Sequence, residues 1–297
     1  MKKIIAFALT CVLMLGALMS CGDEKQGNTT TDSTSGGEPS GMTGNITVIS
    51  REEGSGTRGA FVELMGIEDD DGDHTTELAE ISNSTSVVLQ TVAQNKNAIG
   101  YISLGSLDSS IVKALSVDGV EATVDNINAG KYAVSRPFIL ATNGDVSEVA
   151  QDFIQFVLSD DGQAIVEKSG YIKVESNGAY QASGKSGKVT LAGSTSVSPV
   201  MEKLADAYKK LNPDVKIEIQ ESGSSAGIES AIQGAVEIAM SSRELKDDEA
   251  KTLKSQTIAL DGIAVIVNSS NSLDTLTSKQ VKNIFEGNVS TWEEVIK

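Results

Sequence analysis

Three segments of the chain pass from β-branched and apolar residues into a cluster of serine, threonine and glycine, and then into a helical pattern. They begin at Val48 (VISREEGSGTRGAFVELMG), Val189 (VTLAGSTSVSPVMEKLADAY) and Ile217 (IEIQESGSSAGIESAIQG). The first N–H groups of a helix have no partner within the helix, and the helix dipole favours negative charge there. Hydroxyl and backbone donors at three helix starts therefore predict a bound oxyanion.

Two of these loops also match enzyme motifs, but each lacks the partner that its chemistry requires. Gly54, Gly56 and Gly59 satisfy GxGxxG, yet the acidic stretch EDDDGDHTTE stands where a dinucleotide-binding fold has its second strand. The GSSAG loop, 223–227, satisfies GxSxG, yet the histidine base of such a hydrolase follows the serine, whereas His74 precedes it. The serines are better explained as hydrogen-bond donors, and we expect neither a cofactor nor enzymatic activity.

The chain is strongly acidic, with a formal net charge of −17. Nucleic acid binding needs clustered lysine and arginine, so we expect no nucleic acid partner. The acidic run from Glu68 to Asp73 does not fit a calcium-binding EF-hand, because counted from Asp69 the glycine stands at the fourth position rather than the sixth. A solvated loop is favoured there, and we expect no metal. An anion would bind against this overall field, which favours a buried, dehydrated site.

The beginning of the chain predicts export and a lipid anchor. Two lysines precede an apolar stretch, 4–19, that is too short and wrongly flanked for a membrane span and is typical of a secretory signal. The stretch ends in LMSC, which resembles the lipobox of bacterial lipoproteins, so we expect a signal peptide over 1–20 and lipidation of Cys21. Residues 21–44, rich in serine, threonine and glycine, are expected to form a flexible tether. These features predict an extracytoplasmic lipoprotein anchored to the bacterial cell membrane; the alternative is a secreted protein in which Cys21 is incidental.

Strand and helix patterns alternate along the rest of the chain, which predicts an α/β architecture with largely parallel sheets. The expected strands lie near 46–50, 98–103, 131–141, 188–192, 215–220 and 258–268, and the expected helices near 57–66, 85–95, 146–169, 198–211, 226–234, 246–254 and 277–286. A polar stretch, 176–187, is expected to be an internal linker between two structured blocks, 45–175 and 188–297. Trp292 is expected to be a core or hinge anchor, because no second aromatic residue flanks it.

Seven segments together resemble one known family. They are REEGSGTR from Arg51, GSTSV from Gly193, GSSAG from Gly223, MSSREL from Met240, AIGY from Ala98, the segment 132–142 with Ser135-Arg136-Pro137, and the helix 150–170. This combination is similar to the phosphate-binding lipoproteins of the high-affinity phosphate ABC transporter, the PstS family. The resemblance covers nearly all of residues 45–297, and it implies a binding protein rather than an enzyme.

The order of these segments differs from that of the family. In relatives the GSTSV segment comes first, and the stretch that resembles 276–295 runs directly into the strand before REEGSGTR, whereas here that stretch ends the chain. We therefore interpret the chain as circularly permuted, which is tolerated when the old termini lie close together. The resemblance implies a two-lobed periplasmic binding protein-like (type II) fold, with the ligand cleft between lobes that close around the ligand by a hinge motion. One lobe is expected to combine 45–123 with 270–297, and the other to span 124–269.

The resemblance also implies which residues bind phosphate. Arg51 offers a planar fork of donors and a positive charge against the anion. Glu53 offers an acceptor for the proton of phosphate, which sulfate lacks at neutral pH, so it predicts phosphate selectivity; alternatively, Glu53 pairs with Arg51 or Arg58 to hold the loop. Ser242 stands where some relatives have an aspartate acceptor. The remaining expected contacts are backbone and hydroxyl donors at the three helix starts: Ser55, Gly56, Thr57, Ser194, Thr195, Ser196 and Ser224.

On these grounds the chain is expected to capture inorganic phosphate outside the membrane, as a monomer, and to deliver it to an ABC transporter permease. A phosphate-sensing or adhesion module with the same lobes is one alternative, and binding of another tetrahedral oxyanion is a second. A third is that the order reflects a rearranged gene whose product binds nothing. A titration with phosphate helps to separate these alternatives, because it tests both whether phosphate is the ligand and whether the permuted chain folds.

Overall fold

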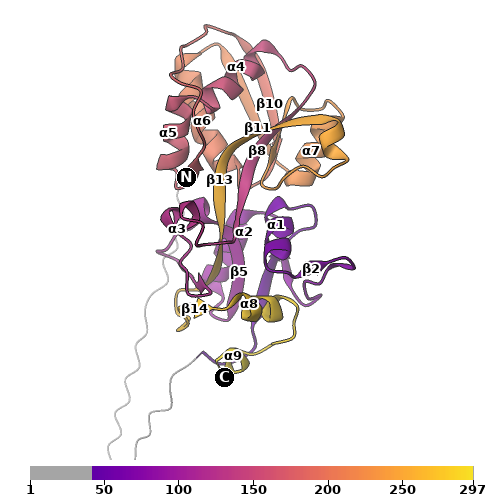
Figure 1. Ribbon diagram of the computed structural model, residues 1–297, viewed down its shortest axis with the longest axis vertical. Helices are drawn as coiled ribbons and strands as arrows, with labels where there is room; N and C mark the ends of the chain where they lie inside the picture. The colour runs from indigo at the N-terminus through magenta and orange to yellow at the C-terminus, as the bar shows by residue number, and fades with distance from the viewer. Residues whose placement is uncertain (1–41, 297) are drawn as a thin grey trace, which may run out of the picture. The chain divides into compact units, whose positions relative to one another are not determined.

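The computed structural model describes residues 42–296, which fold into two lobes connected by two long strands (Figure 1). The predicted signal peptide, Cys21 and most of the predicted tether lie outside the described residues. Within the described chain, no helix is both long and apolar enough to cross a bilayer. The first lobe combines 42–134 with 263–296, and the second spans 135–262, because the buried side chains divide into separate hydrophobic cores along these lines.

The first lobe contains part of a large mixed sheet and two separate two-stranded sheets, with helices around them. Its strands are β1 (Thr47–Arg51), β2 (Glu68–Asp69), β3 (Gly72–Asp73), β4 (Glu80–Ser82), β5 (Ala98–Ser103), β6 (Val112–Ala114), β7 (Ser116–Val117) and β14 (Thr275–Leu276). Its helices are α1 (Gly56–Leu64), α2 (Thr85–Gln94), α3 (Val124–Asn128), α8 (Ser278–Phe285) and α9 (Trp292–Val295), with a 3₁₀ turn η1 (Leu104–Ser106). The side chains of Ser55 and Ser84 accept hydrogen bonds from backbone N–H groups at the starts of α1 and α2, which explains where these helices begin.

The second lobe has helices on both faces of its sheet. Its strands are β9 (Ile172–Lys173), β10 (Gly187–Gly193), β11 (Val215–Glu221) and β12 (Ile238–Ser241). Its helices are α4 (Glu148–Val157), α5 (Asp160–Lys168), α6 (Ser198–Leu211) and α7 (Ser224–Ile232), with a 3₁₀ turn η2 (Glu249–Lys251). Neighbouring residues of β10 point to opposite faces: Leu191 packs in the core under α4 to α6, and Ala192 packs in the core under α7.

Two long strands, β8 (Ser135–Asn143) and β13 (Leu253–Asn268), connect the lobes. They pair antiparallel with each other, and the sheet order is β11-β10-β12-β8-β13-β5-β1-β4, with β6 and β9 also on β13. Strands β10, β11 and β12 run parallel, as do β1, β4 and β5. The expectation of largely parallel sheets is therefore right within each lobe and wrong for β8 and β13. Strand β8 runs from the first lobe to the second, and β13 returns beside it in the opposite direction.

The hydrophobic core of the first lobe gives way to that of the second at the hinge, where β8 and β13 pass between the lobes. Val134 and Ile263 belong to the core of the first lobe, together with Ile172 from β9, while Phe138 and Ala259 belong to that of the second. The change of lobe therefore falls near 134 and 263, whereas the sequence analysis expected it near 123 and 270. No break in composition marks the change, because both strands continue through it without interruption.

Two expected helices differ in the structure. The helical pattern near 146–169 is divided into α4 and α5, because the hydroxyl of Ser159 accepts a hydrogen bond from the N–H of Gly162 and starts a new helix. The helix expected near 246–254 is a short 3₁₀ turn, and β13 begins at Leu253. Leu253 is paired with Asn143 of β8, so pairing with a distant strand overrides the local helical pattern.

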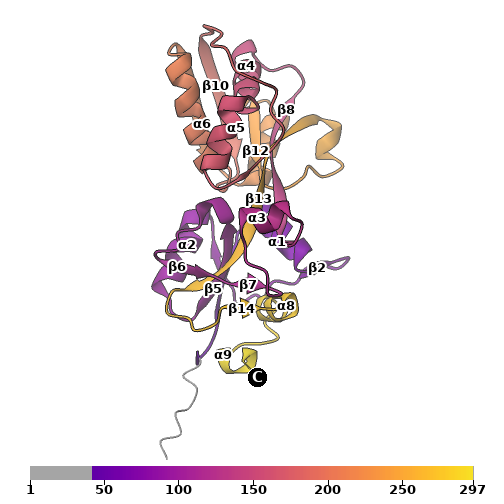
Figure 2. The same ribbon diagram turned by 60° about the vertical axis from the view of Figure 1, so that its left-hand side comes forward.

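The two ends of the described chain lie together on the first lobe (Figure 2). Asn45 forms a β-bridge with Thr291, and the N–H of Trp292 donates to the carbonyl of Gly44 at 3.0 Å. Trp292 is fully buried and packs in the core of the first lobe, as the sequence analysis expected of a core anchor. The circular permutation requires ends that lie side by side, and this arrangement supports it.

The polar stretch 176–186 lies on the second lobe as an extended strap, without regular structure. The hydroxyls of Tyr180 and Ser183 donate to Oδ2 of Asp152 on α4, at 2.6 and 2.7 Å. The hydroxyl of Tyr208 on α6 donates to the same oxygen at 2.6 Å. The sequence analysis expected a linker here, and the structure shows how that linker is fastened to two helices.

Candidate anion-binding site

Four helix starts, two from each lobe, meet between the lobes. They belong to α1 and α2 of the first lobe and to α6 and α7 of the second. Their small hydroxyl side chains gather there, and we call this group the hydroxyl cluster. Its members are each less than a tenth exposed: Ser55, Thr57, Thr85, Ser194, Thr195, Ser196, Ser224 and Ser242.

Hydroxyl contacts join the lobes directly. The Oγ1 of Thr57 lies 2.9 Å from the Oγ of Ser196. The Oγ1 of Thr85 lies 3.0 Å from the Oγ of Ser196 and 3.2 Å from the Oγ1 of Thr195. A hydroxyl can rotate to donate or to accept, so these same groups can turn toward an anion.

The second lobe contributes the other half of the cluster. The hydroxyl of Ser194 donates to that of Ser242 at 2.9 Å, and the N–H of Ser242 donates to the Oγ of Ser224 at 3.2 Å. Gly56 of the first lobe fits against this pair so closely that a Cβ on Gly56 would lie 2.4 Å from the Oγ of Ser224. The lobes are therefore closed upon each other at this point.

The two second-lobe helices at the site, α6 and α7, begin without a side-chain cap. Neither Val197, before α6, nor Gly223, before α7, can offer a side-chain acceptor to the first N–H groups of its helix. Gly223 has φ +85°, a conformation that residues with a side chain rarely adopt. The positive ends of these two helix dipoles suit an anion beside Ser224 and Ser196.

Arg51 places a positive charge at the edge of the cluster. Its side chain is 2% exposed, and its Nη1 lies 3.4 Å from the Oγ1 of Thr85. Its Nε and Nη2 donate to the carboxylate of Glu52 at 2.8 and 2.7 Å, and its backbone N–H donates to the buried hydroxyl of Tyr101. The guanidinium is therefore held by Glu52 on one side and by Thr85 on the other.

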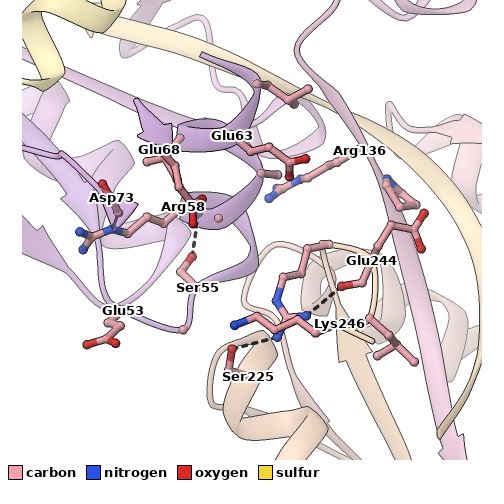
Figure 3. A pocket seen from close by; sticks show the side chains of 18 of the residues that line it. Glu53, Ser55, Arg58, Glu63, Glu68, Asp73, Arg136, Ser225, Glu244 and Lys246 are labelled. Carbon is pink, nitrogen blue, oxygen red and sulfur yellow. Dashed lines mark hydrogen bonds and ion pairs between the residues drawn. The ribbon is translucent and has the colours of Figure 1, made fainter. Parts of the chain in front are cut away.

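The structure does not bring Glu53 to the hydroxyl cluster. Its side chain is exposed and stands on the outer side of the loop (Figure 3). A turn closed by the N–H of Ser55 and the carbonyl of Glu52 puts Glu53 and Gly54 at its tip. Glu52 instead folds back onto Arg51 and pairs with it. The acid paired with the arginine is therefore Glu52 and not Glu53, the residue expected from the sequence.

Thr85, which contacts Arg51, Thr195 and Ser196, was not among the site residues predicted from the sequence. A signal was present, because the stretch SNSTS, 82–86, is a fourth small-hydroxyl cluster before a helical pattern. The strand before it, β4, has three residues and does not show a strand pattern in the sequence. All other expected serines and threonines, with Gly56, are in or against the cluster.

A cavity of about 950 Å³ lies between the lobes next to the cluster (Figure 3), and we call it the inter-lobe cavity. Its wall includes Ser55, Arg136 and Ser225. Ser225, the central serine of the GxSxG match, accepts a hydrogen bond from Arg243 at 3.1 Å, and His74 is paired with Asp69. These partners give Ser225 no histidine base.

A two-lobed fold with a buried ring of hydroxyl donors and an arginine between the lobes defines a solute-binding protein for a small anion. The PBP superfamily domain profile matches residues 25–161 and 178–296. "Phosphate-binding protein PstS 2" of Streptococcus agalactiae is 48% identical over all of this chain and 99% of its own, and that of Streptococcus pneumoniae is 44% identical over 99% of each. The chain therefore belongs to the PBP superfamily and, within it, to the family of phosphate-binding proteins named PstS.

A solved structure agrees with this membership. The crystal structure of a phosphate ABC transporter, phosphate-binding protein from Streptococcus pneumoniae is 48% identical, covers 85% of this chain and all of its own, and has a TM-score of 0.69. The two streptococcal sequences align with this chain from end to end. They therefore share its order of segments, which argues against a misassembled gene.

Proposed function

We propose that this protein captures inorganic phosphate outside the cytoplasmic membrane and delivers it to the permease of an ABC transporter. The observation that carries the proposal is the buried hydroxyl cluster, closed between two lobes with Arg51 at its edge. The names of the streptococcal relatives support the same ligand.

Binding requires that the anion exchange its water for hydrogen bonds from the protein. Each hydrogen bond to a charged group contributes about 1.5–3 kcal/mol, so several hydroxyl and backbone donors offset the desolvation of phosphate. The donors come from both lobes, so they converge only when the lobes close around the ligand. Closure by a hinge at β8 and β13 then explains both capture and release.

Selectivity for phosphate needs an acceptor for its proton. Glu52 is the acid beside Arg51, and each carboxylate oxygen has a lone pair left after its bond to the guanidinium. Sulfate at neutral pH has no proton to donate and would face the carboxylate charge. We propose that Glu52 has the role that the sequence analysis gave to Glu53, with Ser242 as a donor.

The same proposal places the protein outside the membrane as a monomeric lipoprotein. Its support is the sequence of the first 21 residues, which predicts a signal peptide and lipidation of Cys21. A role as a binding protein of a transporter needs no catalytic group and no cofactor, and the protein is proposed not to be an enzyme. Incorporation of labelled palmitate, and its loss in Cys21→Ser, tests the anchor.

Transport in cells tests the function. A strain that depends on this gene for growth at low phosphate should take up labelled phosphate, and the Arg51→Lys variant should take up much less, because lysine lacks the fork that binds Glu52 and the anion. Lys113→Gln, which breaks an exposed ion pair with Asp274 on the first lobe, is the control and should not change uptake. Normal uptake by Arg51→Lys, with both proteins present in equal amounts, would contradict the proposal.

A further inference from the structure

The hinge holds a second buried guanidinium, that of Arg136 on β8. Its side chain is 2% exposed, and its Nε and Nη2 lie 3.4 and 3.2 Å from Oδ2 of Asp261 on β13. The other oxygen of Asp261 accepts a hydrogen bond from Ser103 at 2.9 Å. The guanidinium carbon also lies 5.5 Å from the ring centre of Phe138. These contacts fix the orientation of Arg136.

One edge of this guanidinium is left without a partner. The Nη1 of Arg136 is buried and makes no hydrogen bond to any described residue. A buried N–H group of a charged side chain that lacks an acceptor is costly and rare. Arg136 lines the inter-lobe cavity together with Ser55, and Figure 3 shows its side chain extending from β8 into the space between the lobes. An acceptor that enters this space would satisfy it.

Arg136 and Arg51 are presented in the same manner. Each gives its Nε and Nη2 to one carboxylate, that of Asp261 or of Glu52, and each keeps Nη1 outside the ion pair. Burial lowers the pKa of Arg136, Asp261 acts to raise it, and the charge of Arg51 lowers it further. The two cations are thus close enough to repel each other, and an anion bound near both would relieve that repulsion.

Tyr171 connects Arg136 to the hydroxyl cluster. Its ring lies 5.2 Å from that of Phe138, on which Arg136 is stacked, and its hydroxyl lies 3.5 Å from the carbonyl of Ser196. The guanidinium of Arg136 is therefore on the hinge side of the cluster, whereas Arg51 is held at the end of β1.

We propose that Arg136 is a second anion-binding residue, which donates its Nη1 to the bound oxyanion, and that Asp261 is the residue that positions it. The inference rests on the proposed function, because it takes phosphate as the ligand. Because Arg136 lies on a strand that passes between the lobes, its Nη1 is in place before the lobes close around the anion.

Double variants that neutralise both members of an ion pair test the role of Arg136 without leaving an unpaired charge buried. Arg136→Gln with Asp261→Asn removes one cation and one carboxylate at the hinge, and Lys113→Gln with Asp274→Asn removes the same charges from an exposed ion pair. Calorimetric titration with phosphate should show a loss of affinity of about ten-fold or more for the hinge variant, the worth of one charged hydrogen bond, and no change for the exposed one. Equal affinity of the hinge variant and the unmodified protein would overturn the inference.

Asp261→Asn alone keeps the test decisive if the double variant does not fold. The amide oxygen of asparagine can still accept the hydrogen bonds of Arg136, so the guanidinium stays positioned. The carboxylate charge that competes with the ligand is gone, so phosphate affinity should be kept or raised. A loss as large as ten-fold would show that the pair serves the hinge structure alone, and would overturn the inference. Absence of phosphate binding by the unmodified protein would instead contradict the proposed function.

Discussion

The hydroxyl of Thr57, at the start of α1, lies 2.9 Å from the hydroxyl of Ser196, before the start of α6. The two residues belong to different lobes, and both are almost fully buried. Hydroxyl groups buried at a contact between lobes must be satisfied by each other or by a ligand. A polar contact of this kind suits an interface that opens to admit a hydrophilic solute, whereas an apolar one would hold the lobes together.

Gly56→Ala should prevent full closure. A Cβ at Gly56 would lie 2.4 Å from the Oγ of Ser224 and 2.7 Å from that of Ser242, which is closer than such atoms approach. Phosphate affinity measured by calorimetry should fall by about ten-fold or more, because the two halves of the cluster no longer meet. The thermal midpoint of the free protein should not fall, since alanine favours the helix that begins here.

Gly59→Ala is the matched control for this substitution. Gly59 lies in the same helix, and a Cβ there would meet its nearest neighbour, the Cδ of Arg243, at an ordinary 3.9 Å. Its phosphate affinity should equal that of the unmodified protein. If both alanine variants bind phosphate normally, the lobes do not close as tightly on the ligand as the structure indicates.

Glu52→Gln and Glu53→Gln should behave differently. Glu52 holds Arg51 and is the proposed acceptor for the proton of phosphate, whereas Glu53 is exposed. Calorimetry should show weaker phosphate binding and a smaller preference over sulfate for Glu52→Gln, with little change for Glu53→Gln. The reverse result would show that Glu53 turns into the site when phosphate binds, as the sequence analysis expected.

The strap makes stability depend on acid pH through Asp152. Burial acts to raise the pKa of Asp152, but hydrogen bonds from Tyr180, Tyr208 and Ser183 outweigh it, so the pKa lies below its ordinary value of 3.8. A group with a depressed pKa in the folded state stabilises the protein above that ordinary value and loses its contribution as the pH falls through the folded pKa. Asp152→Asn should therefore lower the free energy of unfolding at neutral pH, by about 2 kcal/mol.

Chemical denaturation at several pH values checks this prediction. The difference between Asp152→Asn and the unmodified protein should be constant near neutral pH and should shrink below pH 3.8, where the carboxylate takes up a proton. Phosphate affinity should not change, because the strap lies away from the cluster. A difference that grew on acidification would show that Asp152 does not act as a charged acceptor.

Restoring the order that the family resemblance implies should give a working protein. A variant that joins residue 296 to residue 42 through a short linker, and opens the chain within 184–186, keeps every contact of the cluster. It should bind phosphate with unchanged affinity, because Gly44 and Trp292 already lie side by side. A variant that folds but fails to bind phosphate would show that residues 42 and 296 cannot be joined by a loop without disturbing the site.

The sequence predicted the site better than it predicted the hinge. Loops such as GSTSV and GSSAG are recognisable because a strand pattern changes to a helical one around small donors, and the structure brings them together. The choice between Glu52 and Glu53 was beyond the sequence, because neighbouring acids differ in role through the turn that Ser55 closes. Arg136 belongs to a segment that carries the family resemblance, but the sequence did not indicate a buried guanidinium, since its partner Asp261 lies more than a hundred residues further along the chain.

The central claim is that the closed hydroxyl cluster binds phosphate, and calorimetric titration of the unmodified protein tests it most directly. The account predicts one phosphate bound per chain, with sulfate weaker by about ten-fold or more because it cannot donate a proton to Glu52. Binding of phosphate and sulfate with equal affinity would contradict the role of Glu52. No heat from either anion, with the chain folded, would contradict the site itself.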